Sequence, residues 1–198
     1  MPLPDRLRHF RRATLELSCL AAGSLAVAWA QRMPLFPRTF PSWRGLLAGV
    51  AAYGMAVLFM RPRWRSAVER QVRVAHLFMP SNGRERSWWL GVSLLAGVGE
   101  EITWRGVQTG LLVAATGSYA IAAVLSALSF GGAHAVQGWK SAAVIVLFAL
   151  GFQALVWLTG SLYVAMAVHI SFDVTAGLSY GRLGRQFGYR PAGAPAGA

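Results

Sequence analysis

Six long apolar stretches dominate the chain and limit what it can fold into. Each is close to the roughly 20 residues that an α-helix needs to cross a bilayer. Hydrophobic residues make up 55% of the 198 residues and charged residues only 13%, about half of their share in average soluble domains. We therefore predict an all-α, polytopic membrane bundle of about six spans. The predicted spans are residues 13–30, 43–61, 88–115, 118–137, 141–159 and 161–180.

The basic residues lie almost entirely between or outside these stretches. The net charge of +12 comes from 18 arginines and one lysine. If the N-terminus is cytoplasmic, fifteen of them fall on the cytoplasmic side and only Arg32, Arg38 and Arg44 on the other. By the positive-inside rule this predicts cytoplasmic termini and contact with anionic lipid head groups. No nucleic-acid motif accompanies the charge, so nucleic-acid binding is not expected. The arginine-rich composition favours a bacterial inner membrane.

The stretches divide the chain into three parts. Residues 1–87 hold two spans and a basic segment at 62–87, which is expected to lie on the membrane surface as an amphipathic helix or a linker. Residues 88–180 are expected to form a four-helix core, with tight connections at Gly117-Ser118 and Thr159-Gly160. Residues 181–198 are expected to be a basic and then disordered tail rich in Pro, Ala and Gly.

The first stretch allows two interpretations. Its basic start, apolar run and Ala28-Trp29-Ala30 resemble a signal peptide with a cleavage site. We expect a retained helix, because a multispanning protein needs no cleavage. The topology of the other five spans is the same either way.

Titratable side chains inside the stretches are rare, and a charge at a helix centre costs about 2.5–3.5 kcal/mol on insertion scales. A small membrane protein that keeps six such groups at this depth is expected to use them. The third stretch contains Glu100, Glu101 and Arg105, the fourth His134, and the sixth His169 and Asp173.

Helical spacing separates the two neighbouring glutamates. Glu101 and Arg105 are four residues apart, so they share a helix face and are expected to pair. Glu100 lies about 100° around the helix from Glu101, which leaves its carboxylate free to face another group. Glu100 is therefore the predicted reactive carboxylate.

The remaining polar residues suit peptide hydrolysis. His169 and Asp173 share a helix face, and Phe130 is placed to pack against His134 and fix its rotamer. A free glutamate and a histidine can hold a water molecule and remove its proton. A second histidine with a hydrogen-bonding neighbour can stabilise the resulting oxyanion. This chemistry needs no covalent intermediate, and no GxSxG motif is present.

The ordered motifs EExxxR, FxxxH and HxxxN/D resemble those of the CAAX protease and bacteriocin-processing family, which includes the Ras-converting CAAX endopeptidases. Here they read EEITWR, FGGAH and HISFD, and the resemblance covers about residues 88–180. It implies a glutamic intramembrane protease in which Glu100 and His134 activate water. It also implies that His169 and Asp173 form the oxyanion site and that Glu101 and Arg105 support the arrangement.

The last motif position departs from the CAAX endopeptidases, which often have Asn where this chain has Asp173. An ionised Asp cannot donate to an oxyanion. The residue therefore either orients His169 by accepting its ring N–H or acts in its protonated form.

Three other functions compete with this interpretation. A zinc protease would use the same side-chain types, but the chain lacks HExxH and its two intramembrane histidines lie on different stretches. We therefore expect neither a metal nor another cofactor. A proton-coupled transporter or an inactive membrane scaffold is the alternative of a different class. The expected substrate is a membrane-associated leader or C-terminal tail.

Overall fold

The apolar stretches fold as helices whose ends are set by capping residues and by glycines. The computed structural model describes residues 3–37 and 40–190, and these residues contain no strand. Asp5, Ser42, Asn82 and Ser118 each accept a backbone N–H of the first helical turn that follows, which satisfies donors that the helix cannot. The long helices are α1 (Arg6–Ala30), α2 (Trp43–Glu69), α3 (Gly83–Glu100), α5 (Tyr119–Ala133), α6 (Trp139–Thr159) and α7 (Leu162–Gln186).

Shorter elements join or extend these helices. A π-helix, η2 (Glu101–Gln108), and α4 (Thr109–Thr116) follow α3 without a break. Two 3₁₀ turns, η1 (Arg73–Phe78) and η3 (Ala135–Gln137), precede α3 and α6. The predicted tight connections are confirmed, because α4 and α5, and α6 and α7, are each separated by two residues. Gly117 and Gly160 adopt positive φ at these turns, a conformation that glycine takes at no steric cost.

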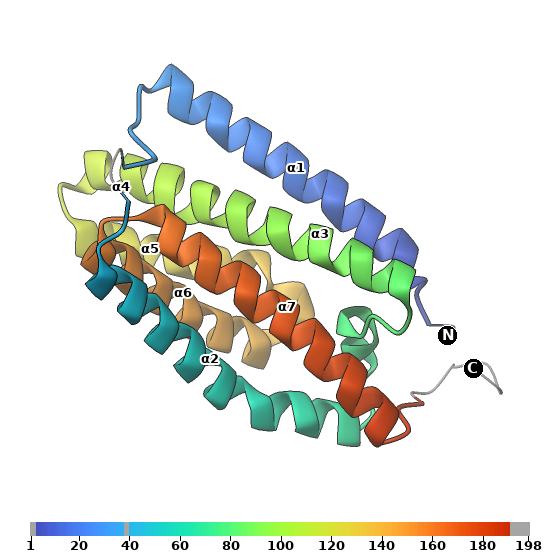
Figure 1. Cartoon of the computed structure of the whole chain (residues 1–198). Helices are drawn as coiled ribbons and strands as arrows, with labels where there is room; N and C mark the ends of the chain where they lie inside the picture. Colours follow the sequence, from blue (N-terminus) through green and yellow to red (C-terminus); the bar gives the residue numbers. More distant parts are fainter. Residues whose placement is uncertain (1–2, 38–39, 191–198) are drawn as a thin grey trace.

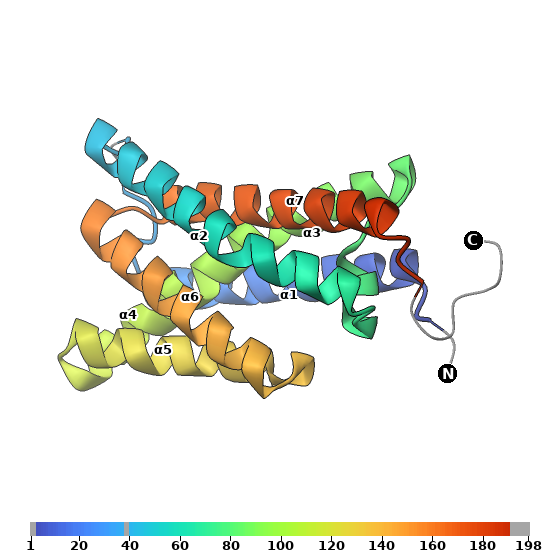
Figure 2. The same ribbon diagram turned by 90° about the horizontal axis from the view of Figure 1, so that it is seen from below.

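The helices form one bundle in which α3 and α7 lie side by side at the centre (Figure 1). Helix α1 packs along the outer side of α3, and α2 packs along α7. Helices α5 and α6 form a second layer that is seen from below in Figure 2. The start of α1 and the end of α7 lie at the same end of the bundle (Figure 1). The catalytic candidates on α3, η2 and α7 therefore come from adjacent central helices.

A polytopic membrane bundle is confirmed, although the helices differ from the predicted spans in length. Within residues 3–37 and 40–190, four helices are long and apolar enough to cross a membrane: α1, α2, α6 and α7. The third predicted span is the continuous unit α3–η2–α4, which its π-helix interrupts. The fourth is shorter than predicted, because α5 has 15 residues and ends before His134.

The predicted surface segment 62–87 is divided among the end of α2, η1 and the start of α3. Trp64 and Val68 are buried in the bundle, where the ring of Trp64 packs against Phe172 and Tyr180 of α7. Helix α7 continues to Gln186, so the first part of the predicted tail is helical. Residues 191–198 of that tail lie outside the described residues.

Candidate active site

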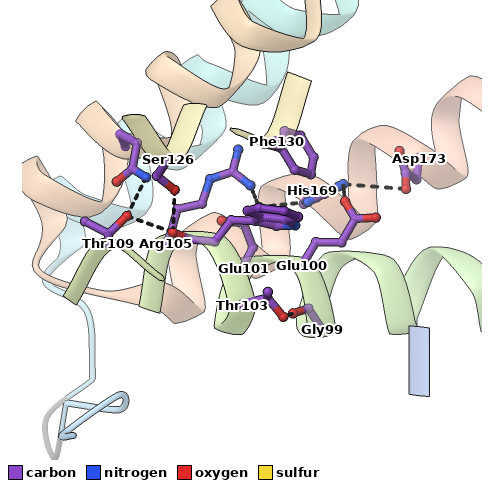
Figure 3. A network of polar contacts seen from close by, with 12 residues as sticks. Gly99, Glu100, Glu101, Thr103, Arg105, Thr109, Ser126, Phe130, His169 and Asp173 are labelled. Atoms are coloured by element: carbon purple, nitrogen blue, oxygen red, sulfur yellow. Dashed lines mark hydrogen bonds and ion pairs between the residues drawn. The ribbon is translucent and has the colours of Figure 1, made fainter. Parts of the chain in front are cut away.

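Five of the predicted site residues meet where η2 faces the middle of α7 (Figure 3). Glu100 is the last residue of α3, Glu101 and Arg105 lie in η2, and His169 and Asp173 lie one turn apart on α7. Helices α3 and α7 can approach each other closely because Gly97 of α3 has no side chain. A Cβ atom at Gly97 would lie 2.9 Å from the backbone nitrogen of Ile170, next to His169. The glycine one turn before Glu101 therefore brings the glutamates within reach of α7.

His169 is oriented by Glu101. Its Nδ1 lies 2.8 Å from Oε1 of Glu101, whose side chain is 0% exposed. An ionised carboxylate can only accept a hydrogen bond, so this contact assigns the Nδ1 proton to His169. The opposite nitrogen, Nε2, is left to face the remaining carboxylates. The ring N–H that orients His169 is thus accepted by Glu101 and not by Asp173, for which this was one of two predicted roles.

Glu100 and Asp173 both face Nε2 of His169. Oε2 of Glu100 lies 3.8 Å from this nitrogen, and Oδ2 of Asp173 lies 3.7 Å from it. These separations suit charge–charge contact but are too long for direct hydrogen bonds. The side chains of Glu100, His169 and Asp173 are 14%, 13% and 27% exposed. This side of the imidazole is therefore the accessible one, whereas Glu101 is sealed behind it.

Arg105 neutralises Glu101 from the protein interior. Its Nη1 lies 3.3 Å from Oε1 of Glu101, and the arginine side chain is 1% exposed. The guanidinium also lies over the rings of Phe130 and Phe152, at 4.6 and 5.2 Å from their centroids. A planar guanidinium suits such stacking, and desolvation strengthens its attraction to the rings. The buried carboxylate is thus balanced by a cation that the aromatic rings hold in place.

His134 lies beside Phe130 of this aromatic set. It is the C-cap of α5, and its ring packs on Phe130 at a centroid distance of 4.6 Å. Its Nδ1 lies 2.9 Å from the carbonyl oxygen of Phe130. Within the described residues, His134 makes no hydrogen bond or ion pair with Glu100. Phe152 packs against His169 at 5.4 Å, and the Arg105 guanidinium lies over both Phe152 and Phe130.

The π-helix is stabilised by several hydrogen bonds to the carbonyl oxygen of Trp104. Both the backbone N–H and the hydroxyl of Thr109 donate to this oxygen, and Ser126 of α5 donates its hydroxyl at 2.8 Å. Gln153 of α6 donates to the Thr109 hydroxyl at 2.8 Å. Figure 3 shows these bonds beside Arg105. Such π segments occur frequently at functional sites. Here side chains from α4, α5 and α6 stabilise the π-helix.

Sequence reasoning missed Phe152, Gln153, Thr109 and Ser126. Gln153 alone carried a signal, since an amide within a long apolar stretch needs a buried partner. Hydroxyl groups such as those of Thr109 and Ser126 are common in membrane helices, where they can bond their own backbone. Phe152 is one apolar residue among many. Its contact with Arg105 depends on how α6 packs.

Two further observations bear on the chemistry. No group of three or more His, Cys, Asp or Glu side chains in the described parts of the chain has the geometry to hold a metal ion. A large apolar groove of about 860 Å³ lies between α2 and α7, with Gly49, Tyr53 and Val168 among its walls. It contains none of the predicted site residues and is therefore separate from the polar cluster.

The comparisons with known proteins agree with the motifs. Residues 83–175 match the family model described as type II CAAX prenyl endopeptidase Rce1-like. This segment contains every residue of the polar cluster. No curated protein and no solved structure matches the chain.

Proposed function

Because residues 83–175 belong to the Rce1-like type II CAAX prenyl endopeptidase family, we propose that the chain is a glutamic intramembrane endopeptidase. The observation that carries the proposal is the contrast between the two neighbouring glutamates. Glu101 is buried and paired with both Arg105 and His169, whereas Glu100 is partly exposed and has no arginine partner in the described residues. A carboxylate without an arginine partner is costly at membrane depth, and the retention of such a group favours a functional role.

In the proposed mechanism, Glu100 is the general base. It removes a proton from a water molecule while the water oxygen forms a bond to the carbonyl carbon of the substrate. The carbonyl electron pair moves to its oxygen, and a tetrahedral oxyanion forms. When the carbon–nitrogen bond breaks, the leaving nitrogen takes the proton from Glu100. The side chain is thereby returned to its ionised state, and no covalent intermediate is required.

The two histidines have separate tasks in this proposal. His169, with its Nδ1–H held by Glu101, presents Nε2 to the accessible side. In its doubly protonated form it would donate from Nε2 to the oxyanion, with Asp173 beside it. His134 would help Glu100 to hold the water. The packing of His134 on Phe130 supports a fixed orientation for its ring.

The proposed substrate is a membrane-associated peptide, either a leader or a C-terminal tail. We place the enzyme in a bacterial inner membrane with both termini in the cytoplasm. This orientation rests on the distribution of arginines, which gather at the end of the bundle that holds the start of α1 and the end of α7.

Mass spectrometry of membrane-protein termini tests the proposal directly. Cells with the wild-type protein are compared with cells that carry Glu100→Gln or His134→Ala. We expect protein termini that are present with the wild type and absent with both variants. Glu69→Gln is the matched control, because Glu69 forms an exposed pair with Arg65 outside the site.

A detergent assay of the purified protein on the peptide found in cells then separates the mechanisms. Cleavage that survives a chelator and is abolished by Glu100→Gln supports the proposal. Loss of cleavage on chelation would instead indicate a metal-dependent reaction. If Glu100→Gln cleaves at the wild-type rate, Glu100 is not the base. If no terminus differs between the strains, a transporter or a scaffold becomes the better explanation.

A further inference from the structure

A second polar site lies at the end of the bundle where α3 begins and α7 ends. It is a pocket of about 250 Å³ between these two helices. Three arginines dominate its walls, one from α3 and two from α7. Pro80, Leu178 and Gly181 complete the lining. None of its lining residues belongs to the polar cluster around Glu100 and His169, and ligand binding there does not depend on peptidase activity.

The floor of the pocket is built from closely packed backbone. The carbonyl oxygen of Pro80 lies 3.0 Å from the point where a Cβ atom would stand on Gly181. One turn to either side, Gly177 receives the ring of Trp89 and Gly184 receives the side chain of Met79. These three glycines allow the η1–α3 connection and the start of α3 to pack closely against α7. The arginines therefore project from a well-packed base.

The three guanidinium groups have no acidic partner. Arg86, Arg182 and Arg185 make no side-chain hydrogen bond or ion pair within residues 3–37 and 40–190. The nearest acidic residue in sequence, Glu85, is already held by Arg6 at 3.1 Å and by Ser81. Two exposed arginines outside the pocket, Arg12 and Arg65, are paired with glutamates. The pocket therefore combines three positive charges with no compensating carboxylate.

Exposed apolar side chains continue from these arginines toward the middle of the bundle. Leu178 lies one turn before Arg182 on α7, and Leu90 and Leu94 lie one and two turns after Arg86 on α3. All three leucines are about half exposed. A ligand that fits such a surface has an anionic head and apolar chains. We propose that the pocket binds the phosphate head group of an anionic phospholipid, whose acyl chains follow the leucines.

The geometry agrees with the physics of membrane surfaces. Basic pockets between transmembrane helices are suited to anionic head groups, because the surrounding lipid lowers the dielectric and concentrates the ligand. Guanidinium groups also bind phosphate oxygens through two parallel hydrogen bonds. Three guanidinium groups around one small pocket would bind anionic phosphatidylglycerol more tightly than zwitterionic phosphatidylcholine.

Native mass spectrometry of the purified full chain tests this site, with phosphatidylglycerol or phosphatidylcholine added to the detergent. The pocket variant is Arg182→Gln/Arg185→Gln. Its matched control, Arg61→Gln/Arg70→Gln, removes two exposed arginines that line no part of the pocket. We expect the wild type and the control to prefer phosphatidylglycerol. The pocket variant should lose at least about tenfold in affinity for it, since each arginine near an anionic lipid contributes several-fold.

Three results would overturn the proposal. Equal losses in the two double variants would show diffuse surface attraction. An unchanged affinity in the pocket variant would show that the lipid binds elsewhere. Displacement of the lipid by inorganic phosphate at the same concentration would assign the site to a free anion. If the pocket variant does not purify as a folded protein, Arg86→Gln on α3 tests the same pocket from the other helix.

Discussion

At the scale of single residues, Arg105 shows how the bundle tolerates a buried carboxylate. Its guanidinium neutralises Glu101 and stacks between Phe130 and Phe152. Replacing Arg105 with Gln leaves Glu101 with only His169 as a partner. Breaking a buried pair in this way costs about 3–5 kcal/mol. We expect a large fall in the thermal unfolding midpoint of the purified protein and a lower yield.

Arg65→Gln provides the matched control for this change. Arg65 also pairs with a glutamate four residues away, but the two side chains are 61% and 41% exposed, and such pairs contribute about 0–1 kcal/mol. The double variant Glu101→Gln/Arg105→Gln should regain part of the stability without regaining activity, because His169 then lacks its carboxylate. Equal midpoints for Arg105→Gln and Arg65→Gln would contradict the role of the buried pair.

His76 gives a second prediction at this scale, outside the membrane-spanning helices. Burial, and then the positive charge of Arg6, lower the pKa of His76 below its ordinary 6.5. The unfolded chain therefore binds more protons than the folded protein just below pH 6.5, and stability falls as the pH drops through that range. Replacing His76 with Gln should flatten this part of the curve of unfolding midpoint against pH. An unchanged slope would exclude His76 as a contributor.

At the scale of the elements, the π-helix determines how the glutamates are presented. Ser126 and Thr109 donate their hydroxyls to the Trp104 carbonyl from different helices. Removing either hydroxyl, by Ser126→Ala or Thr109→Val, deletes a buried hydrogen bond worth about 1 kcal/mol. We expect a lower kcat with little change in KM, because the geometry of Glu100 and Glu101 shifts while the substrate surface remains.

A threonine on the same continuous helix serves as the control. The hydroxyl of Thr116 also donates to a carbonyl, that of Leu112, but on an exposed part of α4. Thr116→Val should leave kcat unchanged, and Ser126→Thr should restore what Ser126→Ala loses. A wild-type kcat for both Ser126→Ala and Thr109→Val would show that the π-helix does not depend on these bonds.

The elements also show how far the sequence could predict the site. Spacing alone predicted the Glu101–Arg105 contact and the packing of Phe130 on His134, because residues four apart in a helix are neighbours. It could not predict the contact between Glu101 and His169, which depends on the approach of α7 to Gly97. The π-helix escaped prediction for a similar reason, since its hydrogen bonds depend on Ser126 of α5, which donates to the Trp104 carbonyl, and on Gln153 of α6, which donates to Thr109. Hydropathy found the helices, whereas their lengths, as in the short α5, depend on local caps.

At the scale of the whole molecule, α1 packs against the part of the bundle that carries the proposed active site. Ser24 of α1 lies 2.7 Å from the hydroxyl of Thr103, two residues after Glu101 in η2. Near the other end, Phe10 is buried against Trp89, and the Trp89 indole donates to the carbonyl of Asp173. The first helix thus contacts α3 and η2 directly and reaches α7 through Trp89. We therefore expect its loss to affect the proposed active site as well as packing.

We therefore expect that a chain lacking residues 1–30 has a lower unfolding midpoint and a lower cleavage rate than the full chain. Supplying residues 1–37 as a separate chain should restore part of both, since the contacts of α1 are side-chain contacts that need no covalent link. Mass spectrometry of the N-terminus in cells shows whether processing after Ala30 occurs. A truncated chain with the midpoint and rate of the full protein would demonstrate that α1 is a dispensable neighbour of α3. A loss that the separate helix repairs would establish α1 as part of the catalytic scaffold.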